Sequence, residues 1–426
     1  METDASDTDV EETGVETDEP TEDTGMVQYF ADEIHSPVTS EMAELWREWL
    51  GSNDALKENV FMKVGASSTA SSRTLYCFAG DDVMLDEYDD LEHTLEHYLA
   101  GDAAGATSFD RVTLAAKSGR TARWVLSGDP SPIEQEYDAL LPSAALIHYG
   151  TNDMGMGSTY ASAMPDFYDA MMSLMDLLLE RGVLPILTGI SHRGDRASAD
   201  AWVPTYNTLI RGMAQGRKVP FLDLYAAMDP LVDHGLSSDG IHLNKGPYGV
   251  CDFTEEALEY GYNMRNLIAL QSLDRVKKVL VDDAQGLDDQ VTRLRGRGVN
   301  DDPFLISKLP FADFRNTLDA VQSVFDVYTC DDADESGPEF VYQLTLEEET
   351  PLRVMVMDRN STDIDIHILD SEMSCLARGH RTIEMTLEPG DYFISADTWV
   401  DDQGVEQAGA YQLIVVECAE GDVACQ

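Results

Sequence analysis

Short apolar runs alternate with longer amphipathic segments between residues 59 and 270. The runs are as short as buried strands, whereas the longer segments repeat their apolar positions every three or four residues, as helices do. Strands that alternate with helices predict a parallel sheet covered by helices on both faces. The expected strands are NVFMKVG, SAALIHYG, VLPILTG and VPFLDL, and the expected helices are LEHTLEHYLAG, PDFYDAMMSLMDLLLERG, AWVPTYNTLIRGMA and TEEALEYGYNMRNLIAL.

The pattern changes after Cys330, where short alternating strands follow one another with turn residues between them. EFVYQLTL, LRVMVMD, DIDIHILD, TIEMTL, DYFISAD and AYQLIVVE predict a small all-β sandwich. We therefore expect an α/β domain over residues 26–275, a helix and connector over 276–325, and the β sandwich over 326–426. Before the first strand, Ser40 is expected to cap a helix that stops at Gly51.

The charge balance is strongly acidic, with 28 basic and 80 acidic residues and a net charge of −52. Residues 1–25 hold 11 acids and few large apolar groups, so we expect a disordered tail there. The other 401 residues still carry 69 acids against 28 bases. Such a surface repels nucleic acid and anionic membranes, and it suits a salty medium, although solubility alone also explains it. No apolar run is long enough to span a membrane.

Three polar motifs follow expected strands, and each also has a purely structural explanation. In VGASST, Ser67 stands at a strand-to-helix turn. A serine at such a turn is either an exposed nucleophile or simply the cap of the following helix. In YGTNDMG, Asn152 offers a side-chain N–H to an oxyanion, or forms an ordinary Asn-Asp turn. In SSDGIHLN, Asp239 precedes His242 by three residues, which suits a carboxylate that orients a general base.

Taken together, these motifs resemble the blocks of the SGNH/GDSL hydrolases. The four blocks are GASST, Gly119 within AAKSGRTARW, GTND and DGIH, and the resemblance covers roughly residues 55–270. It implies a flavodoxin-like three-layer α/β/α fold and an esterase, lipase or deacetylase. The resemblance also implies that Ser67 is the nucleophile, His242 the base and Asp239 the carboxylate that orients this base. The Ser67 and Gly119 N–H groups and the Asn152 side chain would form the oxyanion hole.

One position departs from the family pattern, because Ala66 stands where the first block usually has Asp. The departure puts the local turn in doubt and leaves a degenerate, non-catalytic surface or binding protein as an alternative. An acyltransferase that uses the same triad is the second alternative. The main hypothesis is an exported serine esterase that hydrolyses acetyl or short-chain acyl esters of a small molecule or a glycan, with no cofactor and no nucleic-acid partner.

The last hundred residues resemble the bacterial pre-peptidase C-terminal β sandwich. ESGPEFVYQLTL, DIDIHIL, LEPGDYFISADT and AGAYQLIV carry this resemblance, which implies a module that accompanies secreted enzymes and associates with surfaces. Carboxylates suit Ca²⁺, but in so acidic a chain they also cluster by composition, so we expect no metal. The acids concerned are Asp331, Asp332, Asp334, Asp363 and Asp365.

Six cysteines without a metal-type CxxC pair favour disulfides and an oxidising compartment. No signal segment is visible in this chain, so export implies a true start further upstream. Cys77 follows Ser67 and Cys251 follows His242, so these two cysteines meet if the triad forms. We therefore predict the disulfide Cys77–Cys251. Among the 15 pairings that six cysteines allow, Cys330–Cys375 and Cys418–Cys425 complete the expected set.

Overall fold

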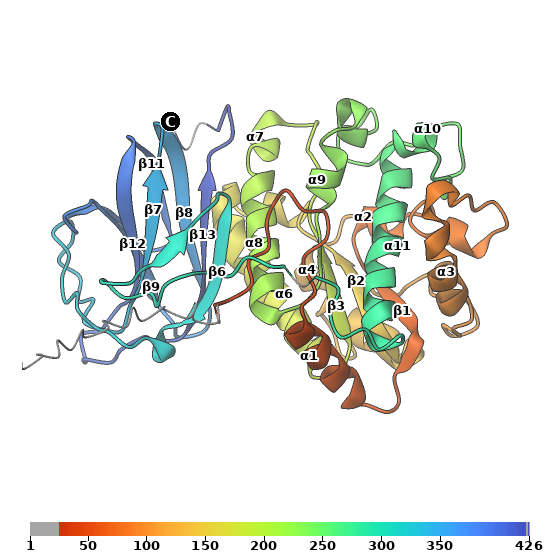
Figure 1. Cartoon of the computed structure of the whole chain (residues 1–426), viewed down its shortest axis with the longest axis horizontal. Helices are drawn as coiled ribbons and strands as arrows, with labels where there is room; N and C mark the ends of the chain where they lie inside the picture. The colour runs from red at the N-terminus through yellow and green to blue at the C-terminus, as the bar shows by residue number, and fades with distance from the viewer. Residues whose placement is uncertain (1–24, 289, 423–424, 426) are drawn as a thin grey trace, which may run out of the picture.

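The computed structural model describes residues 25–288, 290–422 and 425, and Figure 1 shows its arrangement. The acidic tail expected over residues 1–25 lies outside the described residues, except for Gly25. No helix in the described part of the chain is long and apolar enough to cross a membrane.

A parallel sheet forms the centre of the first part of the chain. Its strands are β1 (Lys57–Gly65), β2 (Pro142–His148), β3 (Leu184–Thr188) and β4 (Phe221–Leu222), in the order β1-β2-β3-β4. Every residue of β2 and β3 is buried, as expected of central strands between two helical layers. The four expected strands are therefore confirmed, although β4 is shorter than its apolar run.

A further extended segment lies along the free edge of β1. Gly65 and Ala116 form a parallel bridge, in which the Gly65 N–H donates to the Ala115 carbonyl and the Lys117 N–H donates to the Gly65 carbonyl. This segment follows β1 in the chain but lies outside it in the sheet. The resulting order is the 2-1-3-4-5 order of flavodoxin-like folds. The arrangement places the residues after Lys117 next to the end of β1.

Two groups of helices cover the sheet. Helix α11 contacts α1, α3 and α9, whereas α6 contacts α4 and α8. The two groups give the three layers expected from the alternating pattern, which the structure confirms. The helices are α1 (Ser40–Gly51), α2 (Ser67–Ala70), α3 (Glu92–Leu99), α4 (Ala122–Val125), α5 (Pro132–Leu140), α6 (Tyr160–Leu179), α7 (Ala197–Asp200), α8 (Val203–Arg217), α9 (Leu224–Met228), α10 (Glu255–Leu258) and α11 (Gly261–Leu280).

Two helix boundaries differ from the sequence expectation. Thr39, not Ser40, caps α1, because its Oγ1 accepts the Met42 N–H at 3.3 Å. The helix expected over residues 254–270 is broken into α10 and α11. The break occurs where the Gly261 N–H donates to Asn244 Oδ1 at 2.8 Å, so a long-range side-chain contact replaces the helical hydrogen bond.

The second part of the chain is a β domain of two sheets, which confirms the predicted change of fold class. One sheet has the order β10-β9-β12-β7-β5 and the other the order β11-β8-β13-β6. The strands are β5 (Phe304–Ile306), β6 (Phe311–Asn316), β7 (Phe340–Leu346), β8 (Thr350–Asp358), β9 (Ile364–Leu369), β10 (Cys375–Gly379), β11 (Thr382–Leu387), β12 (Gly390–Thr398) and β13 (Ala410–Glu417).

Residues 276–325, expected to be a helix and connector, contain the end of α11 and two strands of the β domain. Strand β5 pairs in parallel with β7, and β6 pairs with β13 in antiparallel register. Strand β5 covers the free edge of β7, and β6 covers the free edge of β13. The backbone groups along those edges of β7 and β13 therefore form hydrogen bonds. These short strands carry too few residues for their alternation to stand out in the sequence.

The β domain packs directly on α8 (Figure 1). Gln412 Nε2 donates to the Leu209 carbonyl at 2.9 Å, and a Cβ on Gly212 would lie 2.1 Å from that nitrogen. The buried Arg353 guanidinium lies 3.5 Å from the centre of the Trp202 ring and donates to Thr205 Oγ1 at 3.0 Å. The two parts of the chain therefore share one buried interface.

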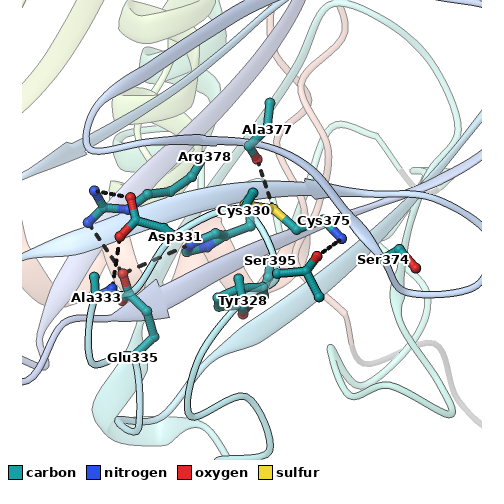
Figure 2. The surroundings of a disulfide bond; sticks show 12 residues. Tyr328, Cys330, Asp331, Ala333, Glu335, Ser374, Cys375, Ala377, Arg378 and Ser395 are labelled. Atoms are coloured by element: carbon teal, nitrogen blue, oxygen red, sulfur yellow. Dashed lines mark hydrogen bonds and ion pairs between the residues drawn. A yellow bond between two sulfur atoms is a disulfide. The ribbon is translucent and has the colours of Figure 1, made fainter.

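Three disulfides are present, and they are the predicted pairs Cys77–Cys251, Cys330–Cys375 and Cys418–Cys425. Figure 2 shows the second of these, with Arg378, Asp331 and Glu335 beside it. Arg378 lies 3.3 Å from Asp331 and also pairs with Asp365. Two of the acids considered for Ca²⁺ thus pair with one guanidinium.

Candidate active site

The end of β1 and the start of α2 form a closed turn that presents Ser67. A Cβ on Gly65 would come within 2.3 Å of Thr69 Oγ1 and 2.7 Å of the His148 carbonyl oxygen, so the turn requires glycine. Ala66 precedes the helix and provides no side-chain cap. Since Ser67 is the first residue of α2, its N–H has no acceptor within the helix. The Ser67 hydroxyl and N–H are both available at the end of the sheet.

Asp239 and His242 share one tight loop, which an antiparallel bridge between Leu236 and Leu243 closes. Asp239 Oδ1 accepts the backbone N–H groups of His242 and Ile241, each at 2.9 Å. Asp239 Oδ2 lies 2.7 Å from His242 Nδ1. These hydrogen bonds, with that from the His242 N–H first, hold the pKa of Asp239 well below its usual range. The carboxylate is therefore ionised whenever the imidazole is neutral.

The histidine joins the loop to the nucleophile turn. Because the ionised Asp239 accepts from His242 Nδ1, the proton of the neutral ring resides on Nδ1. His242 Nε2 is then an acceptor, and it lies 2.9 Å from Ser67 Oγ. The arrangement allows the imidazole to take the proton of that hydroxyl.

The predicted oxyanion donors meet in the same place. Gly119 follows the edge segment with a φ of +74°, a conformation that favours glycine. Asn152 Nδ2 donates to the Arg120 carbonyl at 2.9 Å, which ties the third sequence block to the second. An amide nitrogen carries two hydrogens, so one remains for a ligand. Ser67, Gly119, Asn152 and His242 all line one surface depression of about 190 Å³.

Asp153 supports this arrangement, and the sequence reasoning missed it. Its two carboxylate oxygens accept the Ala122 N–H at 2.8 Å and the Gly150 N–H at 3.0 Å. Burial raises the pKa of Asp153 to about 6. The available signal was an acidic residue directly after Asn152 in a segment that follows a fully buried strand. The remaining lining residues of the depression are Ala66, Ser68, Ser118, His148, Tyr149, Thr151 and Ile241.

The stretch GYNMRNLIAL at the start of α11 holds the loops of the site together. Asn266 Oδ1 accepts the Leu75 N–H at 3.0 Å, while its Nδ2 donates to the Arg73 and Val250 carbonyls, both at 2.9 Å. The disulfide Cys77–Cys251, with a Cα separation of 5.8 Å, joins the same two segments. One segment follows Ser67 and the other follows His242. Both halves of the site are therefore fixed to α11 and to each other.

Comparisons with solved structures find distant likenesses to three groups of proteins. A GDSL-like lipase from Bacteroides thetaiotaomicron is 17% identical, with a TM-score of 0.33, and the match covers 55% of this chain and 98% of that one. An acetyl xylan esterase from Geobacillus stearothermophilus is 14% identical, with a TM-score of 0.35, covering 51% and 96%. The pre-peptidase C-terminal domain of a collagenase from Bacillus anthracis is 14% identical, with a TM-score of 0.18, covering 25% and 89%. No curated protein matches the chain.

A family model gives the assignment. Residues 74–248 match the GDSL-like Lipase/Acylhydrolase family, a span that includes the Gly119, Asn152 and Asp239–His242 blocks and begins shortly after Ser67. Strands β2, β3 and β4 of the parallel sheet lie within this span, whereas β1 precedes it and α11 follows it. The chain therefore contains a GDSL-like lipase/acylhydrolase domain.

Proposed function

We propose that the chain is an exported serine esterase that hydrolyses acetyl or short-chain acyl esters through an acyl-serine intermediate. The observation that carries the proposal is the alignment of Ser67, His242 and Asp239 by hydrogen bonds of 2.9 and 2.7 Å. A nucleophile, a base and an orienting carboxylate in this order are what acyl transfer to serine requires.

The reaction follows from the placement of these groups. Ser67 Oγ attacks the ester carbonyl while His242 Nε2 takes its proton, and Asp239 stabilises the imidazolium that forms. The oxyanion receives hydrogen bonds from the Ser67 and Gly119 N–H groups and from the free hydrogen of Asn152 Nδ2. His242 then protonates the departing alcohol. A water activated by the same nitrogen attacks the acyl-serine, which releases the acid and restores the Ser67 hydroxyl.

The size and exposure of the depression support a small acyl group and water as the acceptor. The depression has a volume of about 190 Å³ and is lined mostly by small or polar residues, so it offers little apolar surface to a long acyl chain. The His242 side chain is 38% exposed, so water reaches the base directly. An acyltransferase needs to exclude that water, so the exposure favours hydrolysis. The three disulfides support export to an oxidising compartment.

The test is a series of p-nitrophenyl esters with acetyl, butyryl and octanoyl chains, run beside acetylated glycans and a Ser67→Ala control. We expect turnover of acetate and butyrate, a kcat/KM for octanoate at least about tenfold lower, and a loss on the order of 10⁴-fold or more in Ser67→Ala. If the folded wild-type chain turns over none of these esters, the protein is a binding module. If turnover needs an added alcohol acceptor, the protein is an acyltransferase.

A further inference from the structure

Arg265 on α11 is a buried guanidinium with an incomplete set of partners. It is 5% exposed, and its Nη2 lies 3.1 Å from His148 Nδ1. Its Nη1 has no hydrogen-bond partner within the residues that the structure describes. Burial lowers the pKa of Arg265 to about 10, so the side chain stays charged at neutral pH. A buried charge of this kind is costly unless another charge compensates it.

The other buried arginines of the described chain have carboxylate partners. Arg211 lies 3.3 Å from Asp223, and Arg353 lies 2.6 Å from Asp422. Within the same residues, no carboxylate lies within ion-pair distance of Arg265. In a chain with 80 acidic residues, a buried guanidinium without an acid points to a counter-ion from solution.

Arg265 lines a small cavity between the sheet, α2 and α11. The cavity has a volume of about 20 Å³, enough for a single particle the size of a water molecule. No carboxylate is among the residues that line the cavity. Its polar lining residues are Lys63, Thr69, Thr74, His148, Thr188 and Arg265. Space for one particle excludes sulfate, phosphate and organic anions.

The unpartnered atoms around this cavity are hydrogen-bond donors. Since an arginine only donates, His148 Nδ1 must accept from it, and the ring proton then resides on Nε2. His148 Nε2 and Thr69 Oγ1, like Arg265 Nη1, are buried and have no partner in the described chain. Lys63 adds a fourth polar group at the wall, where its Nζ donates to the Phe109 carbonyl at 2.5 Å. The Thr69 hydroxyl can also accept, but an anion accepts from all three groups at once and compensates the guanidinium charge, which a water does not.

We propose that this cavity binds one chloride ion, held by Arg265 Nη1, Thr69 Oγ1 and His148 Nε2. Thr69 belongs to α2, the helix that begins with Ser67, and His148 also lines the depression of the active site. The ion therefore links α11 to the nucleophile helix and to the floor of the site. Its binding does not depend on the proposed esterase activity.

Crystals grown with sodium bromide in place of chloride test the proposal directly. We expect an anomalous difference peak for bromide in contact with Arg265 Nη1. An ordered water, or an empty cavity, with no anomalous signal at this position overturns the proposal.

Thermal melts in sodium chloride and sodium gluconate at equal ionic strength give a second test. Gluconate screens charge equally but is too large for the cavity, so chloride should raise the Tm further, by about 2–4 °C. Arg265→Met should lose this difference, whereas Arg297→Met, which removes an exposed arginine, should keep it. Equal Tm values for the wild type in the two salts contradict the proposal, even if Arg265→Met fails to fold.

Discussion

The Nε2 of His242 lies 2.9 Å from the Oγ of Ser67, although 175 positions separate the two residues in the chain. Nothing local brings them together. Ser67 is placed by the end of β1, and His242 by a loop that α11 and the disulfide Cys77–Cys251 hold in position. The contact therefore depends on the folded domain as a whole.

Replacement of the nucleophile should remove almost all activity, whereas replacement of its neighbour should not. Ser67→Ala is expected to lower kcat on an aryl acetate by a factor on the order of 10⁴ or more, which leaves only the contribution of the oxyanion hole. Ser68→Ala is the matched control and should keep most of the activity, because His242 Nε2 contacts Ser67. Peptide mass after fluorophosphonate labelling identifies the reactive serine. A label on Ser68, or on neither serine of a folded protein, contradicts the mechanism.

Loss of the orienting carboxylate should cost less than loss of the nucleophile. Asp239→Ala removes the acceptor of His242 Nδ1 and the loop hydrogen bonds at Oδ1, so the base is misoriented but still present. We expect kcat to remain about 10- to 100-fold above that of Ser67→Ala. Steady-state kinetics of the two variants under the same conditions make the comparison. Equal rates for the two would show that Asp239 does more than orient the ring.

Removal of the disulfide Cys77–Cys251 should lower both stability and activity. The bond spans 174 positions, so its loss with Cys77→Ser and Cys251→Ser should cost about 3–5 kcal/mol in the free energy of unfolding. Urea unfolding and kcat are the measurements. The control pair, Cys330→Ser with Cys375→Ser, spans 45 positions in the β domain and should leave kcat within about twofold of the wild-type value. If both pairs reduce kcat alike, the effect is global rather than local to the site.

Ionisation of Asp153 should make stability fall as the pH rises from about 4 to about 6. Its folded-state pKa of about 6 lies above the usual value, so the folded protein holds the proton more tightly than the unfolded chain. The stabilising contribution is complete below pH 4 and is lost as the pH passes through 6, by at most about 3 kcal/mol. The free energy of unfolding of wild type minus that of Asp153→Asn should follow this curve. A difference that is constant from pH 4 to 7 contradicts it.

Salt should stabilise the protein as a whole. With a net charge of −52, the folded chain repels itself, and counter-ions screen that repulsion. We expect the Tm and the specific activity to rise from low to molar salt, in sodium gluconate as well as in sodium chloride. A Tm that is flat or falls in both salts would indicate that the acidic surface serves solubility alone.

The sequence alone was sufficient for features that depend on neighbouring residues. Apolar runs of strand length predicted β1 to β4, and the alternation after Cys330 predicted six strands of the β domain. The spacing of Asp239 and His242 predicted their contact, because three residues of one loop can close a hydrogen bond without help from the rest of the fold. Ser67, Gly119 and Asn152 were predicted by resemblance, and for Ser67 and Asn152 the strand-end positions also placed them at one end of the sheet.

Only the tertiary structure decided the features that depend on distant partners. The expected helix breaks at Gly261 because the N–H of this residue donates to Asn244. Residues of β5 and β6 form strands because they pair with the edge strands β7 and β13. The buried Arg265 carries no local sign that its charge lacks an acid. For Gly261, β5 and β6, a buried or edge backbone group gains a hydrogen bond, and its partner is set by the packing of the whole chain rather than by neighbours in sequence. For Arg265, the same packing leaves Nη1 without a partner in the described chain.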